Sequence, residues 1–173
     1  MRLLQYFCML FILAATLAGC NKYGVTPTRS MEPALKAGDS FTYATDAYRK
    51  IGDVQRWDII VYYHDFGKPQ GLGLVVKRAV GLPGDKLEFK ENVIILNGSP
   101  IKLPSGVVLN YKELNRQAFG YLCANGNSVS VPADCVFAIG DNAVISYDSR
   151  FCGPINFEDI CGKVISIRHG AKE

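Results

Sequence analysis

The segment VVKRAVGLPGD, residues 75–85, places Lys77 directly behind the apolar residues of a predicted strand. Alternation along this strand puts the lysine on one face together with small and apolar neighbours. An ammonium group there loses hydration, which lowers the lysine pKa and can leave a neutral amine that accepts a proton near neutral pH. A lone strand lysine more often extends its charged end to solvent. A catalytic role therefore requires a second reactive residue elsewhere in the chain.

Ser30 is the candidate partner for that lysine. It lies in PTRSMEPALKAGD, residues 27–39, after a proline-containing segment that we expect to be extended. A serine hydroxyl is a weak nucleophile until a base removes its proton, and a neutral lysine can act as that base. The two histidines, His64 and His169, lie in a polar turn and near the carboxyl end, and the chain has no Gly-x-Ser-x-Gly motif. The residues therefore favour a Ser/Lys pair over a Ser-His-Asp triad.

Short strands and turn residues dominate the rest of the sequence. Its 173 residues are enough for one domain with a sizeable core, and the net charge of +3 is too small and too scattered to predict a nucleic-acid partner. Asn-Gly and Pro-Gly-Asp turns separate the apolar runs, and long helical periodicity is missing. We expect an antiparallel all-β domain with strands at FTYA, WDIIVYY, GLVVKRAV, KLEFK, NVIILNG, SVSVP, CVFAIG and KVISIR.

The amino-terminal segment MRLLQYFCMLFILAATLAGC predicts an export signal or a short membrane anchor. Its apolar stretch, residues 3–18, would reach about 25 Å as a helix, slightly less than a hydrocarbon core of about 30 Å. The ending LAGC resembles the bacterial lipobox, in which the chain is cut before the cysteine and the sulfur of Cys20 carries a lipid. The alternative is an uncleaved anchor. We therefore expect a signal or anchor at residues 1–20 and an exported, tethered domain at 21–173, with an insertion at about 86–135.

The cysteines are typical of an exported protein. Two of the six cysteines lie in the amino-terminal segment, and the remaining even number suits two disulfides in an oxidising compartment. Three pairings are open, of which the simplest is local: Cys123 with Cys135 and Cys152 with Cys161. The gaps within these pairs are longer than the short ligand spacings of structural zinc sites. We expect disulfides and no metal.

Four segments together resemble the successive signature boxes of bacterial type I signal peptidases, in the same order. They are SMEPAL (30–35), GDVQRWDIIVY (52–62), VKRAVGLPGD (76–85) and GDNAVISYDSRFCGPI (140–155). The resemblance extends over about residues 28–168. It implies a β-rich fold of two antiparallel sheets, as in signal peptidases and LexA-like proteins, and a Ser/Lys dyad that needs no cofactor. It also implies a serine endopeptidase that removes signal peptides from exported preproteins.

The resemblance assigns roles to particular residues. Ser30 becomes the nucleophile and Lys77 the general base, and the Ser30 backbone N–H with the Thr28 hydroxyl forms the oxyanion hole. Such a hole is worth about 3 kcal/mol per donor in acyl transfer. Ser146 becomes the serine that hydrogen-bonds and orients the lysine. Asp148 and Arg150 become a supporting charge pair behind the site.

The same resemblance implies substrates, a location and two alternatives. The substrates are preproteins with small residues one and three positions before the cut, and the location is the bacterial inner membrane with the catalytic domain in the periplasm, next to membrane lipid. Arg29 and Trp57 depart from the family pattern, since Trp57 replaces a usual glycine. A dedicated conjugative-transfer or pilin-maturation peptidase therefore stays an alternative, as does a non-catalytic periplasmic binding lipoprotein with the same fold.

Overall fold

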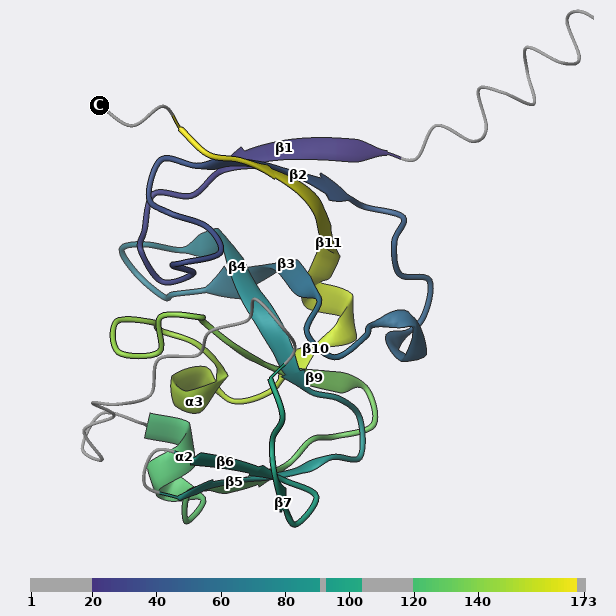
Figure 1. Ribbon diagram of the computed structural model, residues 1–173, viewed down its shortest axis with the longest axis vertical. Coiled ribbons are helices and arrows are strands. Elements are labelled where there is room, and N and C mark those ends of the chain that lie inside the picture. The colour runs from purple at the N-terminus through teal and green to yellow at the C-terminus, as the bar shows by residue number, and fades with distance from the viewer. Residues whose placement is uncertain (1–19, 91–92, 104–119, 171–173) are drawn as a thin grey trace, which may run out of the picture.

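The structure, a computed structural model, describes residues 20–90, 93–103 and 120–170 (Figure 1). The described strands are β1 (Asn21–Val25), β2 (Ser40–Ala44), β3 (Ile59–Asp65), β4 (Leu72–Gly81), β5 (Lys86–Lys90), β6 (Val93–Leu96), β7 (Ser99–Pro100), β8 (Ser128–Ser130), β9 (Cys135–Ile139), β10 (Ile155–Asn156) and β11 (Ile160–Arg168). The described helices are short: α2 (Gly120–Ala124), α3 (Ser149–Cys152) and the 3-10 turns η1 (Ile51–Asp53) and η3 (Phe157–Asp159).

The strands form two antiparallel sheets, which confirms the expected fold class. The larger sheet has the order β1-β2-β11-β3-β4-β9-β10, and the smaller has the order β7-β6-β5-β8. Figure 1 shows the smaller sheet and α2 at the end of the molecule opposite to β1 and β2. The smaller sheet comes from residues 86–130. The insertion that we expected at about 86–135 stays a prediction. The proposed boundary between an anchor and a domain at residue 20 stays a prediction.

The pairing of β4 leaves part of this long strand with an open edge. Along one side, β4 pairs with β3 over residues 72–78, from Leu72 opposite Asp65 to Arg78 opposite Ile59. On its other side, β4 pairs with β9 only from Arg78 to Gly81. Within the described residues, the first part of β4 up to Lys77 therefore has one edge without a partner strand.

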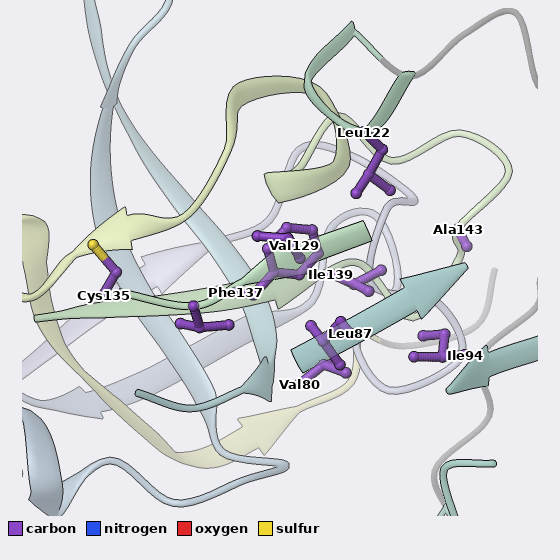
Figure 2. Close-up of a cluster of buried hydrophobic side chains, with 10 residues drawn as sticks. Val80, Leu87, Ile94, Leu122, Val129, Cys135, Phe137, Ile139 and Ala143 are labelled. Atoms are coloured by element: carbon purple, nitrogen blue, oxygen red, sulfur yellow. The ribbon is translucent and has the colours of Figure 1, made fainter. Parts of the chain in front are cut away.

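The core consists of clusters that hold the site's elements in place. The largest lies between the two sheets (Figure 2) and contains Val80, Leu87, Ile94, Leu122, Val129, Val131, Cys135, Phe137, Ile139 and Ala143. A second cluster, Met31, Leu35, Phe41, Tyr43 and Val61, packs between the larger sheet and the segment that follows Ser30. Since burying one large aliphatic side chain contributes about 2 kcal/mol, Met31 and Leu35 anchor this segment firmly.

The amino-terminal region contains a strand that the sequence did not predict, and the predicted signal or anchor precedes the described residues. Residues 21–25, for which no strand was predicted, form β1 and pair with β2 at the edge of the larger sheet. Within the described part of the chain, no helix is long and apolar enough to cross a membrane. The predicted signal or anchor, residues 1–19, lies outside the described residues.

The expected disulfides are absent from the described structure. Cys135, Cys152 and Cys161 are free thiols, so neither Cys123–Cys135 nor Cys152–Cys161 is formed. Each of these thiols has other neighbours, and the Cys135 Sγ contacts the Asn156 side chain. Cys152 contacts the Asp148 carbonyl oxygen next to α3, whereas Cys161 packs in β11 against the Met31 cluster. An even number of cysteines thus does not predict a disulfide, because the bond also requires a specific distance and direction between the two residues.

Candidate active site

Ser30 and Lys77 meet in a buried contact. The Lys77 Nζ lies 3.0 Å from the Ser30 Oγ, and the lysine is only 5% exposed. Lys77 projects from β4, where its backbone lies opposite Ile60 of β3. The Asn142 N–H donates to the Ser30 carbonyl oxygen at 3.1 Å, while neighbouring Met31 is buried in the core. Two residues 47 positions apart are therefore held together by the sheet on one side and by a loop on the other.

Burial prepares Lys77 to act as a base. Loss of hydration lowers the pKa of Lys77 from 10.5 to about 8, although the nearby Asp148 carboxylate partly opposes this shift. Its Nζ also donates to the neighbouring Val76 carbonyl oxygen at 2.9 Å, which limits the rotamers of a flexible side chain. A neutral amine in contact with a serine hydroxyl can remove its proton as that hydroxyl attacks a carbonyl.

The Thr28 side chain lies next to the Ser30 hydroxyl. Its Oγ1 is 3.1 Å from the Ser30 Oγ. The same segment is held by Thr26, whose N–H donates to the Asp39 carbonyl oxygen and whose carbonyl oxygen accepts from the Gly38 N–H. The Thr28 hydroxyl is therefore adjacent to the position at which a carbonyl oxygen would acquire negative charge during attack by Ser30.

Ser146 is buried beside the site, but its expected hydrogen bond to Lys77 is not formed. The Ser146 Oγ has no hydrogen-bond partner within the described structure, because Lys77 donates to Ser30 and to the Val76 carbonyl instead. Ser146 packs against Gly140, where a Cβ atom would clash with both the Ser146 hydroxyl and the Ser30 carbonyl. Gly140 thus lets the loop of residues 140–148 approach the nucleophile closely.

Asp148 and Arg150 form a fully buried ion pair. The Arg150 Nε and Nη2 donate to the two Asp148 carboxylate oxygens at 2.7 Å each, and both side chains are 0% exposed. Asp148 also accepts from the Gly140 N–H at 3.0 Å, and Arg150 donates to the Ala143 carbonyl oxygen at 2.8 Å. The pair therefore braces the loop of residues 140–148 that packs against Ser30.

A second buried ion pair was missed by sequence reasoning. The Arg78 Nε and Nη2 donate to the Asp141 carboxylate at 2.7 and 2.6 Å, and its Nη1 donates to the Trp57 carbonyl oxygen at 2.8 Å. Arg78 directly follows Lys77, and Asp141 directly precedes Asn142, which holds the Ser30 carbonyl. The pair therefore links the strand of Lys77 to the loop that holds the Ser30 carbonyl oxygen. The sequence did contain one indication of this pair, because one signature box contains the positive Arg78 and another contains the negative Asp141.

The backbone of Trp57 has a left-handed conformation, with a φ of 79°. This region of φ favours glycine, which is also the residue that the resemblance to signal peptidases implies at this position. The Trp57 N–H donates to the Ala79 carbonyl oxygen at 2.8 Å, and its side chain packs against the core cluster between the sheets. Core packing thus offsets the cost of an unfavourable φ, and the Trp57 carbonyl remains directed at Arg78.

Replacing Arg78 with lysine is expected to lower the free energy of unfolding by about 1–2 kcal/mol. A lysine keeps the charge but cannot donate to both Asp141 oxygens and to the Trp57 carbonyl together. Urea unfolding of both proteins measures the difference. The matched control is Arg29→Lys, because Arg29 forms an exposed pair with Glu32 and should change stability by less than about 0.5 kcal/mol. If both substitutions changed the free energy of unfolding equally, the hydrogen bonds of the Arg78 guanidinium would have no structural role.

An apolar cleft of about 430 Å³ opens beside Ser30 and Lys77. One wall is the segment from Gly24 to Thr28, and the other is β4 from Leu74 to Lys77, at the open edge of that strand. Of the residues that line it, all within the described ranges, Lys77 alone carries a charge. The lining residues are Gly24, Val25, Thr26, Pro27, Thr28, Ser30, Phe41, Phe66, Leu74, Val75, Val76, Lys77, Ile145 and Tyr147.

No group of three or more His, Cys, Asp or Glu side chains suited to a metal ion occurs in the described ranges. The contact between Ser30 and Lys77 offers the chemistry of a serine hydroxyl beside a buried amine, at the end of a cleft that can hold an extended peptide. This arrangement is that of the serine hydrolases, which act through a covalent acyl-enzyme.

The family follows from comparison with known proteins. The family model "Signal peptidase, peptidase S26" matches residues 1–168, and the chain therefore belongs to the signal peptidase family. It is 32% identical over 142 residues to signal peptidase I of Bacillus caldolyticus, covering 81% of this chain and 75% of that protein. It is 30% identical over 176 residues to signal peptidase IB of Staphylococcus aureus (strain Mu50 / ATCC 700699), covering 94% and 87%.

The expectation of a type I signal peptidase, a serine endopeptidase that removes signal peptides from preproteins, is thereby confirmed. Members of this family are typically membrane-anchored. Among solved structures, signal peptidase I of Enterococcus faecalis V583 matches with a TM-score of 0.42 and 23% identity, over 65% of this chain and 97% of that one.

Proposed function

We propose that the protein removes signal peptides from exported preproteins through an acyl-enzyme formed on Ser30, with Lys77 as the general base. The single observation that carries this assignment is the buried 3.0 Å contact between the Lys77 Nζ and the Ser30 Oγ. A binding protein that merely retained the fold would have no need to bury an amine against a hydroxyl, since burial of an unpaired ammonium costs free energy.

The reaction proceeds by two acyl transfers. The Ser30 Oγ attacks the scissile carbonyl as Lys77 takes its proton, and the Ser30 N–H with the Thr28 hydroxyl receives the developing negative charge. The protonated Lys77 then delivers the proton to the leaving amine, and the signal peptide stays esterified to Ser30. Lys77 next removes a proton from water, which attacks the ester. The proton returns to Ser30 as the acid is released.

The substrate lies in the cleft as an extended peptide. The open edge of β4 has unpaired backbone groups that can hydrogen-bond an added strand, and the apolar walls accept uncharged side chains. Small residues, typically alanine, one and three positions before the cut fit close to the dyad. The same cleft could bind a single dedicated preprotein, so the proposed mechanism does not require that the protein cleaves many different preproteins.

We infer from the predicted amino-terminal anchor or signal that this reaction takes place at a membrane. Cys20 is exposed and directly precedes β1, whose last residues Gly24 and Val25 already line the cleft. At about 3.3 Å per residue, five residues of strand span about 17 Å, which keeps the cleft near a membrane that holds residues 1–20. We infer a bacterial inner membrane location with the catalytic domain in the periplasm. The tether is either an uncleaved anchor or a lipid on Cys20.

The function is tested with a preprotein that has an Ala-x-Ala site, incubated with the full chain in detergent. We expect one cut, directly after the second alanine, and mass spectrometry of the products identifies that bond. A matched preprotein with Leu at the last position before the cut should remain intact. Cleavage of both preproteins at the same rate, or of neither, would contradict the proposal.

The pH dependence of this cleavage tests the role of Lys77. Because burial lowers the Lys77 pKa to about 8, its neutral fraction falls about tenfold per pH unit below that value. We expect kcat/KM to rise through pH 6 and 7 and to level off above about 8. A midpoint near 6.5 would indicate a histidine as the base, and a rise that continues to pH 10 would indicate a solvated lysine.

A further inference from the structure

An aromatic cluster closes the end of the cleft that lies farther from Ser30 and Lys77. Phe66, just after β3, and Tyr147, just before α3, have ring centroids 6.1 Å apart. His64 packs edge-on against Phe66 at 4.7 Å and also contacts Tyr147 at 5.8 Å, and Phe151 stacks on Tyr147 at 5.2 Å. We call Phe66 and Tyr147 the aromatic wall. His64 and Phe151 support it from two different elements.

The aromatic wall lies at a defined distance from the dyad. The ring of Phe66 rests against Gly73 of β4, where a Cβ atom would come within 3.0 Å of the Phe66 Cε2. Gly73 precedes Lys77 by four residues, which is about 13 Å along a strand. An extended peptide that follows the open edge of β4 from the dyad therefore reaches the wall about four residues from the scissile bond.

The cleft extends from the dyad in one direction. Residues 24–28 lead along the chain to Ser30, and residues 74–77 lead to Lys77, so both walls converge on the reacting atoms. Preproteins share their distinguishing features before the cut, whereas the sequences after it belong to unrelated mature proteins. A built groove on one side of the dyad therefore fits the signal side of the substrate.

The chemistry of the wall agrees with an apolar occupant. Phe66 is 44% exposed and Tyr147 is 51% exposed, and Leu74 and Ile145 extend the same apolar surface. Within this end of the cleft no lining residue carries a charge. Because neighbouring rings already hold Phe66 and Tyr147, little side-chain entropy is lost when a ligand packs against them.

We propose that the aromatic wall binds an apolar side chain four or five residues before the scissile bond, at the carboxyl end of the signal's apolar segment. Phe66 and Tyr147 thereby determine specificity for the known reaction, in addition to the small residues nearer the cut. This inference rests on the function proposed above, and its test keeps the two separable.

Turnover of two peptides is the first arm of the test. Both peptides carry the same Ala-x-Ala site, and residues four and five before the cut are Leu in one and Ala in the other. For the wild-type full chain in detergent we expect kcat/KM to be about tenfold higher for the Leu peptide, through a lower KM. Phe66→Ala and Tyr147→Ala should reduce that preference to about twofold, whereas Tyr147→Phe, which keeps the ring, should retain it.

Leu72→Ala is the matched control. Leu72 lies near Phe66 in the chain and is 68% exposed, but it does not line the cleft. Its loss should leave the preference between the two peptides unchanged. A wild-type preference that persists in Phe66→Ala and Tyr147→Ala, or that falls as much in Leu72→Ala, would overturn the inference.

Binding to an inactive enzyme is the second arm, and it does not depend on turnover. Fluorescence anisotropy compares the two labelled peptides on Ser30→Ala and on Ser30→Ala combined with Phe66→Ala. We expect tighter binding of the Leu peptide to the first and a loss of about tenfold in the second. If wild type cuts neither peptide, the proposed function fails, but this arm still decides the aromatic wall. Equal binding of both peptides to Ser30→Ala would refute it.

Discussion

Replacing either Ser30 or Lys77 with alanine is expected to lower preprotein cleavage by about 10⁴-fold or more. Without the Ser30 hydroxyl no acyl-enzyme forms, and without the Lys77 amine the described residues that line the cleft include no other charged group to remove the serine proton. Because the two residues act as one unit, the double variant should be hardly slower than either single one. Cleavage of an Ala-x-Ala preprotein, followed over hours with excess enzyme, measures the residual rate.

Lys77→Arg separates a base from a mere positive charge. Arginine keeps the charge in contact with Ser30, but it cannot be deprotonated in a protein. If Lys77 acts as the base, this variant should be as inactive as Lys77→Ala. Thermal unfolding of each variant shows whether it is folded. Cleavage above about one tenth of the wild-type rate by folded Ser30→Ala or Lys77→Arg would be incompatible with the dyad.

The strands and the place of Lys77 within one of them could be predicted because their signals are local. Alternation over residues 72–81 places Lys77 on a face with small and apolar neighbours, and the structure puts it in β4 among buried residues. Ser30 was identified from its own short motif, residues 27–39. No pattern in the sequence between Ser30 and Lys77 predicts that the two side chains meet, as they do in the structure. β1 was missed because its residues are mostly exposed and lack alternation, and its pairing with β2 alone defines it.

Non-local contacts explain the remaining differences. Arg78 and Asp141 are 63 positions apart, and opposite charge alone does not specify a partner at that distance. The cysteine count suggested disulfides, but the thiols of Cys152 and Cys161 belong to different packing environments. Ser146 lies next to Gly140 and the Ser30 carbonyl, but the hydrogen bond that we expected it to make with Lys77 is not formed, because Lys77 donates to the Val76 carbonyl oxygen and to Ser30 instead. The spacing of residues in the sequence does not determine the rotamer of a flexible side chain such as that of Lys77.

Replacing Arg150 with methionine is expected to destabilise the protein by about 3–5 kcal/mol. Methionine fills a similar volume but leaves the Asp148 carboxylate buried without its counter-ion, which costs several kcal/mol in a low-dielectric interior. It also leaves the Ala143 carbonyl oxygen without its donor. Urea unfolding gives the free-energy change. Glu88→Gln is the control, because this carboxylate pairs with Lys86 and Lys90 at the surface and should matter little.

A double variant that removes the charges of both Asp148 and Arg150 shows whether the two residues stabilise the protein as an ion pair or only by packing. Combining Arg150→Met with Asp148→Asn removes the uncompensated carboxylate but keeps an oxygen that can accept from the Gly140 N–H. The double variant should therefore be more stable than Arg150→Met alone by about 1–2 kcal/mol. Additive losses would show that Asp148 and Arg150 act independently. Because the pair braces the loop whose Asn142 holds the Ser30 carbonyl, cleavage by the folded fraction of Arg150→Met should fall as well, whereas it should not fall in Glu88→Gln.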